Sequence, residues 1–459
     1  MKIRHYFYSA LLVVLAGVVS ASAKNICEAA KQGDLLQVET WVEKDPQLVN
    51  FKDEESRTPL HWASRGVHMD VLEYLVENGA DVNARDADKV TPLHSLSYRG
   101  NAKAMEILIK KGADVDMKEV NGMSSLMYAA YAGQEAAAVI LIKHGANAKT
   151  RDDTGLTVAD IAEDQGYAGL ARYLISAGAE LTPIADPEIT ELPGNIHRIT
   201  FCYQQCTNIL AVDGPDDVLV IDTGYVRTTE KLKTAITNIS KGKSITVINT
   251  HQHPDHIGGN SMTGDNGTII SHENLEQMTS SGILDKNAIN LQGASGTEYE
   301  GSYTLSFNHR TVRLIPLPGA HTDGDLLVYF EDAGVVHMGD LLISQSFPSL
   351  TRGKKVIEYL AILDEVIDIF DDRTIFVGGH GRNLQKQELV AYRNMLNETI
   401  DIVTRGLKEG KNVESMQQDG VLDKYVTYDT FIPMLNTGYW IETVSKTYKE
   451  RPLNLPTKN

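Results

Sequence analysis

The sequence is poor in cysteine, in positive charge and in long apolar runs. Its 3 cysteines in 459 residues are too few for a disulfide scaffold or a multi-cysteine zinc module. Its 43 Lys and Arg against 61 Asp and Glu leave a net charge of −18, which argues against nucleic-acid binding because phosphates need a basic surface. The hydrophobic content of 42% excludes a disordered or collagen-like chain. The length predicts about two or three globular domains.

The N-terminus has the pattern of an export signal. Lys2 and Arg4 precede an apolar run over residues 8–19, and Ala21-Ser22-Ala23 then supplies a small-x-small cleavage site. A membrane anchor is the alternative, but this run is shorter than the about 20 residues of a spanning helix. We therefore expect residues 1–23 to be a signal peptide. The mature protein is expected to be periplasmic or secreted, without a stable membrane anchor.

The next part of the chain repeats every 33 residues. The repeated positions begin at Thr58, Thr91, Ser124 and Thr157, and the first two copies read Thr-Pro-Leu-His. A second marker keeps this period, at Gly79, Gly112, Gly145 and Gly178. Thr can cap a helix, Pro suits its first turn, and Gly suits the left-handed stop after a second helix. The pattern resembles the ankyrin repeat, so we expect an all-α solenoid of about five repeats over residues 24–182.

The resemblance to ankyrin repeats implies a surface that binds a protein partner, because repeat folds present extended concave faces. A spacer beside the following domain is the alternative. His61 and His94 belong to the Thr-Pro-Leu-His signature, so we expect them to be structural and not metal ligands. Residues 183–193 contain three of the 14 prolines and are expected to be a linker.

The second half of the chain predicts alternating strands and helices. Strands are expected over residues 196–201, 208–212, 218–221 and 245–249, and a helix over residues 230–239. The last of these strands leads into the sequence His251-Gln252-His253-Pro254-Asp255-His256. Imidazoles two residues apart on an extended segment point the same way and can bind one metal ion. The Asp and the third His point toward a neighbouring position, where a second ion can bind.

Three later predicted strands also end in candidate ligands, and ligand sites in α/β folds lie at such strand ends. These candidates are His321, Asp340 and His380, while Asp222 ends an earlier strand. Residues 194–380 carry these motifs in an order that resembles the metallo-β-lactamase superfamily. The resemblance implies an α/β domain over residues 194–400, an αββα sandwich, followed by a helical extension over residues 401–459.

The same resemblance implies a centre of two zinc ions with seven ligands. One ion would be held by His251, His253 and His321, the second by Asp255, His256 and His380, and Asp340 would bridge both. A hydroxide between the ions would be the nucleophile, because zinc lowers the pKa of bound water to about 7. The choice of zinc is implied by the family resemblance and not by the ligand types, because such sets of His and Asp ligands also accept iron or manganese.

Two aspartates receive further roles from the resemblance. Asp255 is the candidate catalytic residue, which would orient the hydroxide or move a proton. Asp222 is expected to fix the metal ligands without touching a metal, with a plain strand-end turn as the alternative. The expected reaction is attack on the carbonyl of a small ester, thioester, lactone or lactam.

The amino-acid sequence of residues 318–330 and 335–342 resembles that of an exported group close to class B β-lactamases. However, Asp340 stands where class B1 and B2 enzymes use a cysteine, and Ile343 stands where B1 enzymes carry a lysine. A class B-like β-lactamase is therefore the alternative function, and an ankyrin scaffold with a vestigial hydrolase domain is a second one. Lys354 and Lys355 either bind an anionic substrate or form a solvated charged run.

Three smaller features complete the sequence-based expectations. Cys202 and Cys206 flank a short turn between two predicted strands, and they either form a disulfide or remain free thiols. His337 lies on an apolar strand, which favours a core histidine over a ligand. An apolar stripe at helical spacing is expected to pack on the hydrolase sheet, and it consists of Tyr392, Leu396, Ile400, Val403 and Leu407.

Overall fold

The computed structural model describes residues 26–264, 267–272, 288–291, 302–317, 319–350, 356–428, 432 and 435–450. The chain divides into two compact units, Met1–Pro183 and Ile184–Asn459. Among the described residues, no helix is both long and apolar enough to cross a membrane. The expected signal peptide, residues 1–23, lies outside the described ranges.

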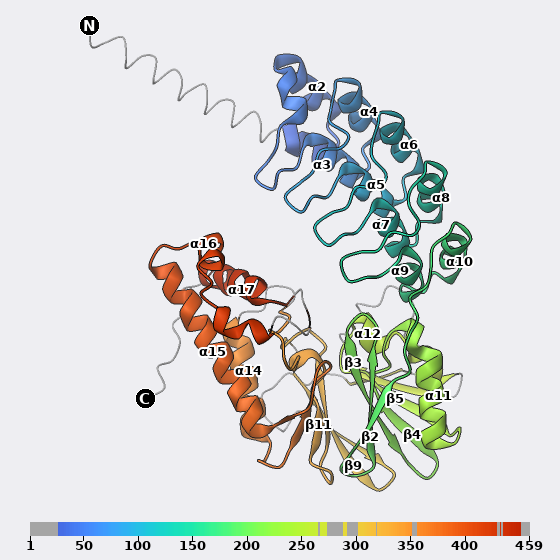
Figure 1. Cartoon of the computed structure of the whole chain (residues 1–459), viewed down its shortest axis with the longest axis vertical. Coiled ribbons are helices and arrows are strands. Elements are labelled where there is room, and N and C mark those ends of the chain that lie inside the picture. Colours follow the sequence, from blue (N-terminus) through green and yellow to red (C-terminus); the bar gives the residue numbers. More distant parts are fainter. Residues whose placement is uncertain are drawn as a thin grey trace. The chain divides into compact units, whose positions relative to one another are not determined.

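The first unit is a stack of paired helices (Figure 1). Helical residues 26–32 pair with the first named helix, and a short 3-10 helix, η1 (Pro46–Asn50), follows. The named helices are α2 (Leu35–Lys44), α3 (Pro59–Gly66), α4 (Met69–Glu77), α5 (Pro92–Arg99), α6 (Ala102–Lys110), α7 (Ser125–Tyr131), α8 (Glu135–Lys143), α9 (Val158–Asp164) and α10 (Ala168–Ser176). One continuous apolar core runs through all of these pairs, so each repeat buries its apolar face against its neighbours. The described residues of this unit thus form five helix pairs.

The Thr-Pro-Leu-His motif joins successive repeats. Thr58 is the N-cap of α3, and its backbone N–H donates to His61 Nδ1 over 3.0 Å. The opposite ring nitrogen, His61 Nε2, lies 3.0 Å from the carbonyl oxygen of Val90 in the following repeat. His94 makes the same contacts with Thr91 and Met123. The structural role expected for both histidines is confirmed.

The described residues of the second unit form two β-sheets (Figure 1). The seven-stranded sheet has the order β1-β2-β3-β4-β5-β6-β7, antiparallel up to β4 and parallel beyond it. Its strands are β1 (Glu188–Leu192), β2 (Ile196–Cys202), β3 (Cys206–Asp213), β4 (Asp217–Ile221), β5 (Ser244–Ile248), β6 (Thr268–His272) and β7 (Ala288–Leu291). The six-stranded sheet has the order β13-β12-β11-β10-β9-β8. Its strands are β8 (Tyr303–Phe307), β9 (Arg310–Pro316), β10 (Leu326–Phe330), β11 (Val335–His337), β12 (Ile375–Val377) and β13 (Leu384–Gln385).

The two sheets pack face to face, and helices cover their outer faces. Alternate residues of β3 show this arrangement, because Leu210 joins the core between the sheets while Ile209 packs outward. Helix α11 (Thr229–Ser240) covers the outer face of the first sheet. Helices α14 (Val356–Ile369), α15 (Lys386–Lys408) and α17 (Thr437–Glu450) cover that of the second. The expected αββα sandwich after an all-α solenoid is confirmed.

Two expected domain boundaries are wrong. The expected linker 183–193 contains β1, which pairs with β2 along its whole length and so belongs to the first sheet. The boundary between residues 400 and 401 falls inside α15. The expected extension 401–459, with α16 (Val413–Gln418), η6 (Asp423–Tyr428) and α17, shares one apolar core with the second sheet. The boundaries were missed because prolines and helical periodicity report local structure, whereas these segments are placed by long-range packing.

The apolar stripe on α15 packs on the sheet as expected. Tyr392, Leu396, Ile400 and Val403 are buried in the core that also contains Leu327 and Val336 of the second sheet, and Leu407 packs against this core. Trp440 on α17 lies in the same core, fully buried, with its ring stacked 5.4 Å from Phe347 and its Nε1–H donating to Thr399 Oγ1 over 2.8 Å. The C-terminal helix therefore supports the loop that follows Asp340.

This packing predicts that Trp440→Ala destabilises the second unit. Replacing a buried Trp by Ala leaves a cavity and should lower the free energy of unfolding by about 3–5 kcal/mol. The measurement is urea unfolding of the whole chain, compared with Val426→Ala, whose side chain is 47% exposed and should change nothing. An unchanged transition in Trp440→Ala would mean that the C-terminal helices form a separate appendage.

Candidate metal centre

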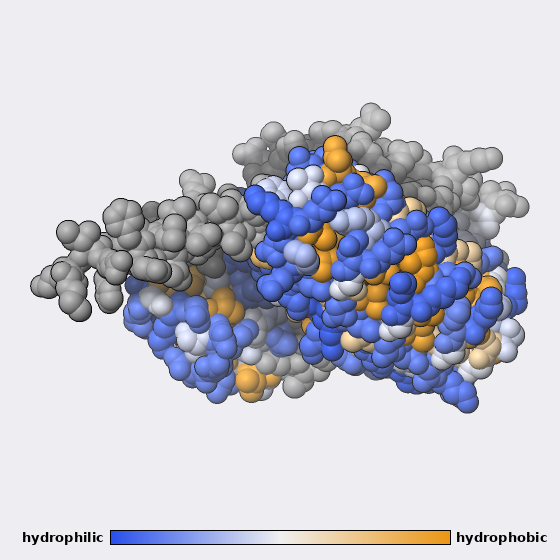
Figure 2. Space-filling model, turned by 90° about the horizontal axis from the view of Figure 1, so that it is seen from above, coloured by the Kyte–Doolittle hydropathy of each residue, from blue (hydrophilic) through white to orange (hydrophobic). Residues whose placement is uncertain are grey.

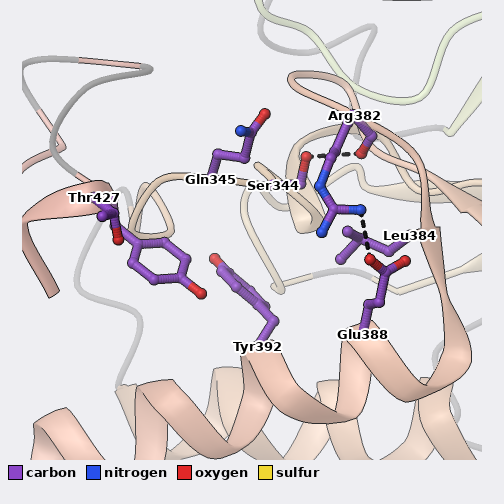
Figure 3. Close-up of a pocket in the computed structure, with 8 residues that line it drawn as sticks. Ser344, Gln345, Arg382, Leu384, Glu388, Tyr392 and Thr427 are labelled. Carbon is purple, nitrogen blue, oxygen red and sulfur yellow. Dashed lines mark hydrogen bonds and ion pairs between the residues drawn. The ribbon is translucent and has the colours of Figure 1, made fainter.

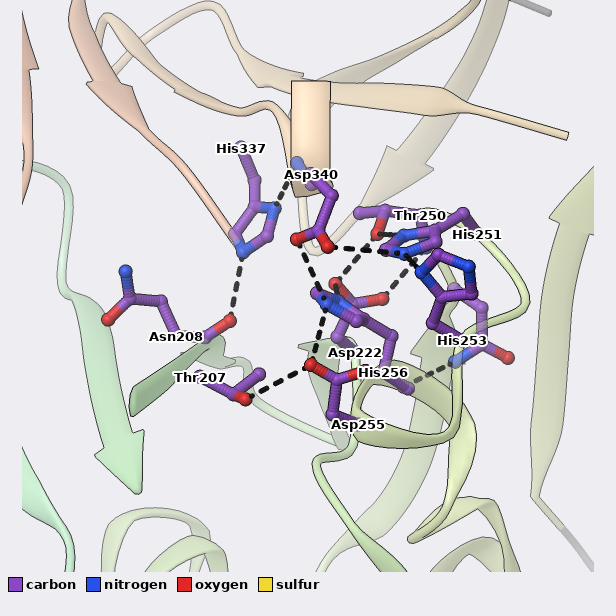
Figure 4. Close-up of polar contacts among 12 residues, drawn as sticks. Thr207, Asn208, Asp222, Thr250, His251, His253, Asp255, His256, His337 and Asp340 are labelled. Carbon is purple, nitrogen blue, oxygen red and sulfur yellow. Dashed lines mark hydrogen bonds and ion pairs between the residues drawn. The ribbon is translucent and has the colours of Figure 1, made fainter. Parts of the chain in front are cut away.

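The candidate ligands meet at the ends of strands from both sheets (Figure 4). β5 leads to His251 and His253, and the short helix α12 (Pro254–Ile257) then carries Asp255 and His256. The second sheet contributes three more residues just beyond its strands. These are His321 after β9, Asp340 in the 3-10 helix η5 (Gly339–Leu341) after β11, and His380 after β12. All seven residues predicted as ligands are thus brought together.

We call His251, His253, His321 and Asp340 the first group. Their ligand atoms all lie within 4.8 Å of one another. His253 Nδ1 is 3.0 Å from both His251 Nε2 and His321 Nε2. Asp340 Oδ2 lies 3.7 Å from His251 Nε2 and 3.5 Å from His321 Nε2. A tetrahedral zinc ion with bonds of about 2.0–2.2 Å needs ligand atoms about 3.3–3.5 Å apart, so the first group has the size of a zinc site.

We call Asp255, His256 and His380 the second group, and their ligand atoms also lie within 4.8 Å of one another. Asp255 Oδ2 is 3.5 Å from His256 Nε2 and 3.2 Å from His380 Nε2. The other oxygen of Asp340, Oδ1, lies 3.2 Å from each of the same two nitrogens. Asp340 therefore faces the first group with one oxygen and the second group with the other, which is the arrangement expected of a bridging carboxylate.

Three atoms of this cluster are buried without a hydrogen-bond partner within the described part of the chain. They are His256 Nε2, His380 Nε2 and Asp340 Oδ1. Unpartnered buried polar atoms are costly, and buried carboxylates more so. With neutral imidazoles, the seven side chains carry two negative charges, those of Asp255 and Asp340. Divalent cations would bind these atoms and offset this charge, so the residues present fit a two-metal centre.

Hydrogen bonds fix the ring nitrogen that three of the histidines direct into the cluster. His256 Nδ1 donates to Asp222 over 2.7 Å, His321 Nδ1 to the Ser349 carbonyl over 2.6 Å, and His380 Nδ1 to the Cys206 carbonyl over 3.0 Å. Because Nδ1 carries the proton in each ring, Nε2 keeps its lone pair for a metal. Such partners orient the ligands of metal sites in general.

Asp222 takes the supporting position that the sequence predicts. It lies beyond β4 in the left-handed region, with φ of +62°, and is fully buried. Besides binding His256, its carboxylate accepts the Thr250 backbone N–H and hydroxyl, each over 2.8 Å. Thr250 Oγ1 in turn lies 3.1 Å from His251 Nδ1. One carboxylate thus orients a ligand of each group.

Two buried residues that support the ligands are missing from the sequence-based expectations. The Asn208 amide donates to the carbonyls of Gly378 and Gly381 over 3.0 and 2.8 Å, on either side of His380. Asp325 accepts the backbone N–H of Thr322 with both oxygens, and burial raises its pKa to about 6. The Asn208 contacts span 170 and 173 residues, so the sequence carries no local signal for them. Asp325 is near His321 in sequence, and a turn carboxylate three residues after Thr322 is a local signal.

Burial and neighbouring charges act differently on the two groups. Burial, reinforced by the adjacent His321, lowers the pKa of His253 to about 4. Burial also acts to lower the pKa of His380, but the carboxylates of Asp340 and Asp255 outweigh it and raise that pKa to about 10. In the first group, the imidazole of His253 is therefore neutral, whereas the carboxylates of the second group favour positive charge on His380.

The loops that carry Asp340 and His380 are linked to each other beside a pocket of about 210 Å³ (Figure 3). Ser344 Oγ donates to the Arg382 carbonyl over 2.7 Å, and the Arg382 guanidinium lies 2.7 Å from Glu388. Ile343 and His380 also form an isolated β-bridge. These contacts fix the distance between Asp340 and His380.

The remaining expectations about side chains have mixed outcomes. Cys202 and Cys206 form a disulfide across the β2–β3 hairpin, which resolves that alternative. His337 is a core histidine as expected, since it accepts the Gly339 N–H on Nδ1 and faces the Asn208 carbonyl with Nε2. Lys354 and Lys355 lie outside the described residues.

Comparison with known proteins identifies both units. A family model described as ankyrin repeats (3 copies) matches residues 26–119 and 97–184, and one described as the metallo-beta-lactamase superfamily matches residues 205–380. The chain is 38% identical over 61 residues to Ankyrin repeat family A protein 2 of Homo sapiens, which is 13% of this chain and 19% of that protein. It is 39% identical over 54 residues to the 26S proteasome non-ATPase regulatory subunit 10 of Dictyostelium discoideum, 12% of this chain and 23% of that one. The chain thus spans less than a quarter of the length of these relatives.

The glycine beside the bridging carboxylate provides a steric test of the centre. A Cβ atom on Gly379 would lie 2.2 Å from Asp340 Oδ1 and 2.8 Å from His256 Cε1. Gly379→Ala should therefore displace the bridging carboxylate and lower the metal content of the purified protein. Gly410→Ala is unsuitable as a control because the φ of Gly410 is +84°. The control is Gly169→Ala, because a Cβ atom on Gly169 would meet no atom closer than 3.6 Å, and this variant should keep its full metal content. Equal metal content in both variants would contradict the bridging role.

Asp222→Asn tests the support of the ligands. The amide cannot accept all three hydrogen bonds, so metal affinity should fall about 10–100-fold, as is usual when a ligand loses its orienting partner. Competition with a chromophoric chelator measures this affinity. Asp216→Asn, at an exposed position just before β4, is the matched control. If Asp222→Asn binds metal as tightly as the control, Asp222 is a plain turn residue.

Proposed function

This chain carries ankyrin repeats followed by a metallo-beta-lactamase superfamily domain, and we propose that it is a metal-dependent hydrolase with a protein-binding array. The observation that carries the proposal is the convergence of seven candidate ligand side chains, six of them buried and His253 half-buried, with Asp340 between the two groups. A scaffold protein with a vestigial hydrolase domain is the rival proposal. The complete ligand set argues against it, because a site without a function has no need of seven ligands and their supporting contacts.

The proposed cofactor is a pair of divalent metal ions, with zinc favoured and iron or manganese as alternatives. His251, His253 and His321 would hold the first ion, Asp255, His256 and His380 the second, and Asp340 both. When bound, such ions polarise a carbonyl and lower the pKa of water to about 7. That chemistry suits the hydrolysis of an ester, thioester, lactone or lactam.

The protein's own side chains determine how water and substrate would be arranged at this centre. Asp255 is 5% exposed, and its Oδ2 is the oxygen directed at the second group. We propose that this oxygen orients the attacking water or accepts its proton, in addition to binding metal. Asp340 is 6% exposed and His251 1%, so bulk water has little access to these two side chains. Exclusion of water strengthens the electrostatic interactions of the site.

A class B-like β-lactamase is the less favoured version of this proposal. Ile343 is 1% exposed and packs against Ile432 and Leu435, so it supplies an apolar contact within the protein where B1 enzymes place a lysine. We therefore expect a substrate whose binding needs no cationic side chain at this position. Lactones, thioesters and simple esters meet that condition better than β-lactams.

We also propose that the ankyrin unit recruits a protein partner. The surface seen in Figure 2 is mostly hydrophilic, with separate apolar patches. On the ankyrin unit, Tyr98 and Tyr131 are 44% and 48% exposed at equivalent positions of successive repeats, and their rings stack with centroids 6.4 Å apart. Aromatic side chains of this kind are typical anchors of protein interfaces.

Export to the periplasm or the medium remains our proposal for the location of the protein. It rests on the pattern of residues 1–23, and the Cys202–Cys206 disulfide is compatible with it because disulfides persist in oxidising compartments. We also propose that the second unit belongs to an exported group close to class B β-lactamases, on the basis of residues 318–330 and 335–342.

The decisive test is hydrolysis by purified, metal-loaded protein. The substrates are a chromogenic cephalosporin, a thioester, a lactone and an aryl ester, each assayed with and without chelator. We expect turnover of at least one carbonyl substrate. In His253→Ala, kcat/KM should fall by more than the about 10–100-fold loss typical of changes outside the ligand set.

The control is His309→Ala, which removes an exposed histidine at the β8–β9 turn and should keep full activity. Fast cephalosporin turnover would establish the β-lactamase instead. Activity that survives both the chelator and His253→Ala would refute metal-dependent hydrolysis. A purified protein that binds no metal would favour the scaffold.

A further inference from the structure

The hairpin between β2 and β3 touches the second group directly. It is closed by the Cys202–Cys206 disulfide, which leaves only Tyr203, Gln204 and Gln205 in the turn. Gln205 Nε2 donates to Asp255 Oδ2 over 2.9 Å, the same oxygen that faces His256 and His380. The next residue, Cys206, accepts the Nδ1–H of His380 on its carbonyl over 3.0 Å. Two of the three ligands of the second group are thus held by this hairpin.

The first group is held by other elements. His251 is oriented by Thr250, and His321 by the carbonyl of Ser349. His256, the third ligand of the second group, is oriented by Asp222. A change in the hairpin should therefore act on Asp255 and His380 and leave the first group in place.

The turn itself is attached to the loop that follows β4. Arg227 Nη1 donates to the Tyr203 hydroxyl over 2.6 Å, and its guanidinium lies 4.9 Å from the Tyr203 ring. Tyr225 meets the same ring edge-on at 5.6 Å. The start of β3 is also attached to the His380 loop, because the Asn208 N–H donates to the Gly379 carbonyl over 2.8 Å. The hairpin is thus fixed on both sides, and the disulfide closes its two strands.

We propose that the disulfide-closed hairpin is the positioning element of the second metal site, with Gln205 as its positioning residue. Opening the Cys202–Cys206 bond removes the covalent closure of the turn and leaves only its noncovalent contacts, so that Gln205 and the Cys206 carbonyl fix Asp255 and His380 less firmly. Affinity for the second metal ion then falls while affinity for the first is kept. The inference rests on the proposed metal centre, but it does not depend on which substrate is hydrolysed.

The test measures the two metal affinities separately, by chelator competition with Zn²⁺ and by metal analysis of the desalted protein. The variant is the double substitution Cys202→Ser with Cys206→Ser, which avoids leaving one free thiol beside the metals. Its control is Cys27→Ser, which removes the buried free cysteine of the ankyrin unit. In the double variant, the second ion should bind about 10–100-fold more weakly, the usual effect of losing an orienting partner. The first ion should bind as in the control.

Two further arms guard against misfolding of the double variant. In the first, folded oxidised protein is treated with a phosphine and desalted. The phosphine supplies two electrons that break the S–S bond, and one water molecule supplies the two protons of the resulting thiols. The oxygen of this water ends on the phosphine, which becomes the phosphine oxide. In the second, Gln205→Ala is compared with Gln204→Ala, a substitution of the same residue type in the same turn. Both reduction and Gln205→Ala should selectively weaken the second ion.

The outcomes separate this inference from the proposed function. Equal loss of both ions, or no loss of either, overturns the positioning role of the hairpin. Wild-type protein that binds fewer than two ions overturns it as well. Two ions in the wild type with selective loss of the second support the inference even if no tested ester, thioester, lactone or lactam is hydrolysed, in which case only the proposed function fails.

Discussion

The second unit is organised around one constraint, which is that imidazole nitrogens and carboxylate oxygens must be held close together in a buried site. Asp340 is the centre of this constraint, because its two oxygens lie 3.2–3.7 Å from nitrogens of four different histidines. Without cations, such a cluster combines unpartnered nitrogens with two buried carboxylates, which is unfavourable. The fold must therefore hold these buried polar groups close together until cations bind.

The sandwich does this by bringing strand ends from both sheets to one place, where hydrogen bonds and packing from neighbouring residues hold the candidate ligands in position. β5 supplies the His251 segment, while β11 and β12 supply Asp340 and His380. The supporting residues come from further away in the chain, and they include Asp222 after β4 and Asn208 on β3. Trp440 and Phe347 form the apolar support beneath the loop that follows Asp340. The geometry of the cluster thus depends on packing well outside it.

The sequence predicts the repeats, the sandwich and the seven side chains that meet in the cluster, because each of these leaves a local signal: a 33-residue period, apolar strands, and polar motifs at strand ends. It does not predict what depends on long-range contacts. β1 looks like a proline-rich linker until it pairs with β2, and the helices beyond residue 400 look separable until Trp440 enters the core. The amide of Gln205 has an ordinary turn sequence around it, and only the fold brings it to Asp255, 50 residues later. Cysteine spacing alone likewise left the Cys202–Cys206 bond undecided.

A crystal structure of the metal-loaded protein, with anomalous diffraction recorded at the absorption edges of zinc, iron and manganese, tests the central claim most directly. The account predicts two anomalous peaks per chain, one among His251, His253 and His321 and one among Asp255, His256 and His380, with Asp340 in contact with both. The edge at which the peaks appear identifies the metal. A single peak, or peaks away from Asp340, would contradict the two-metal centre.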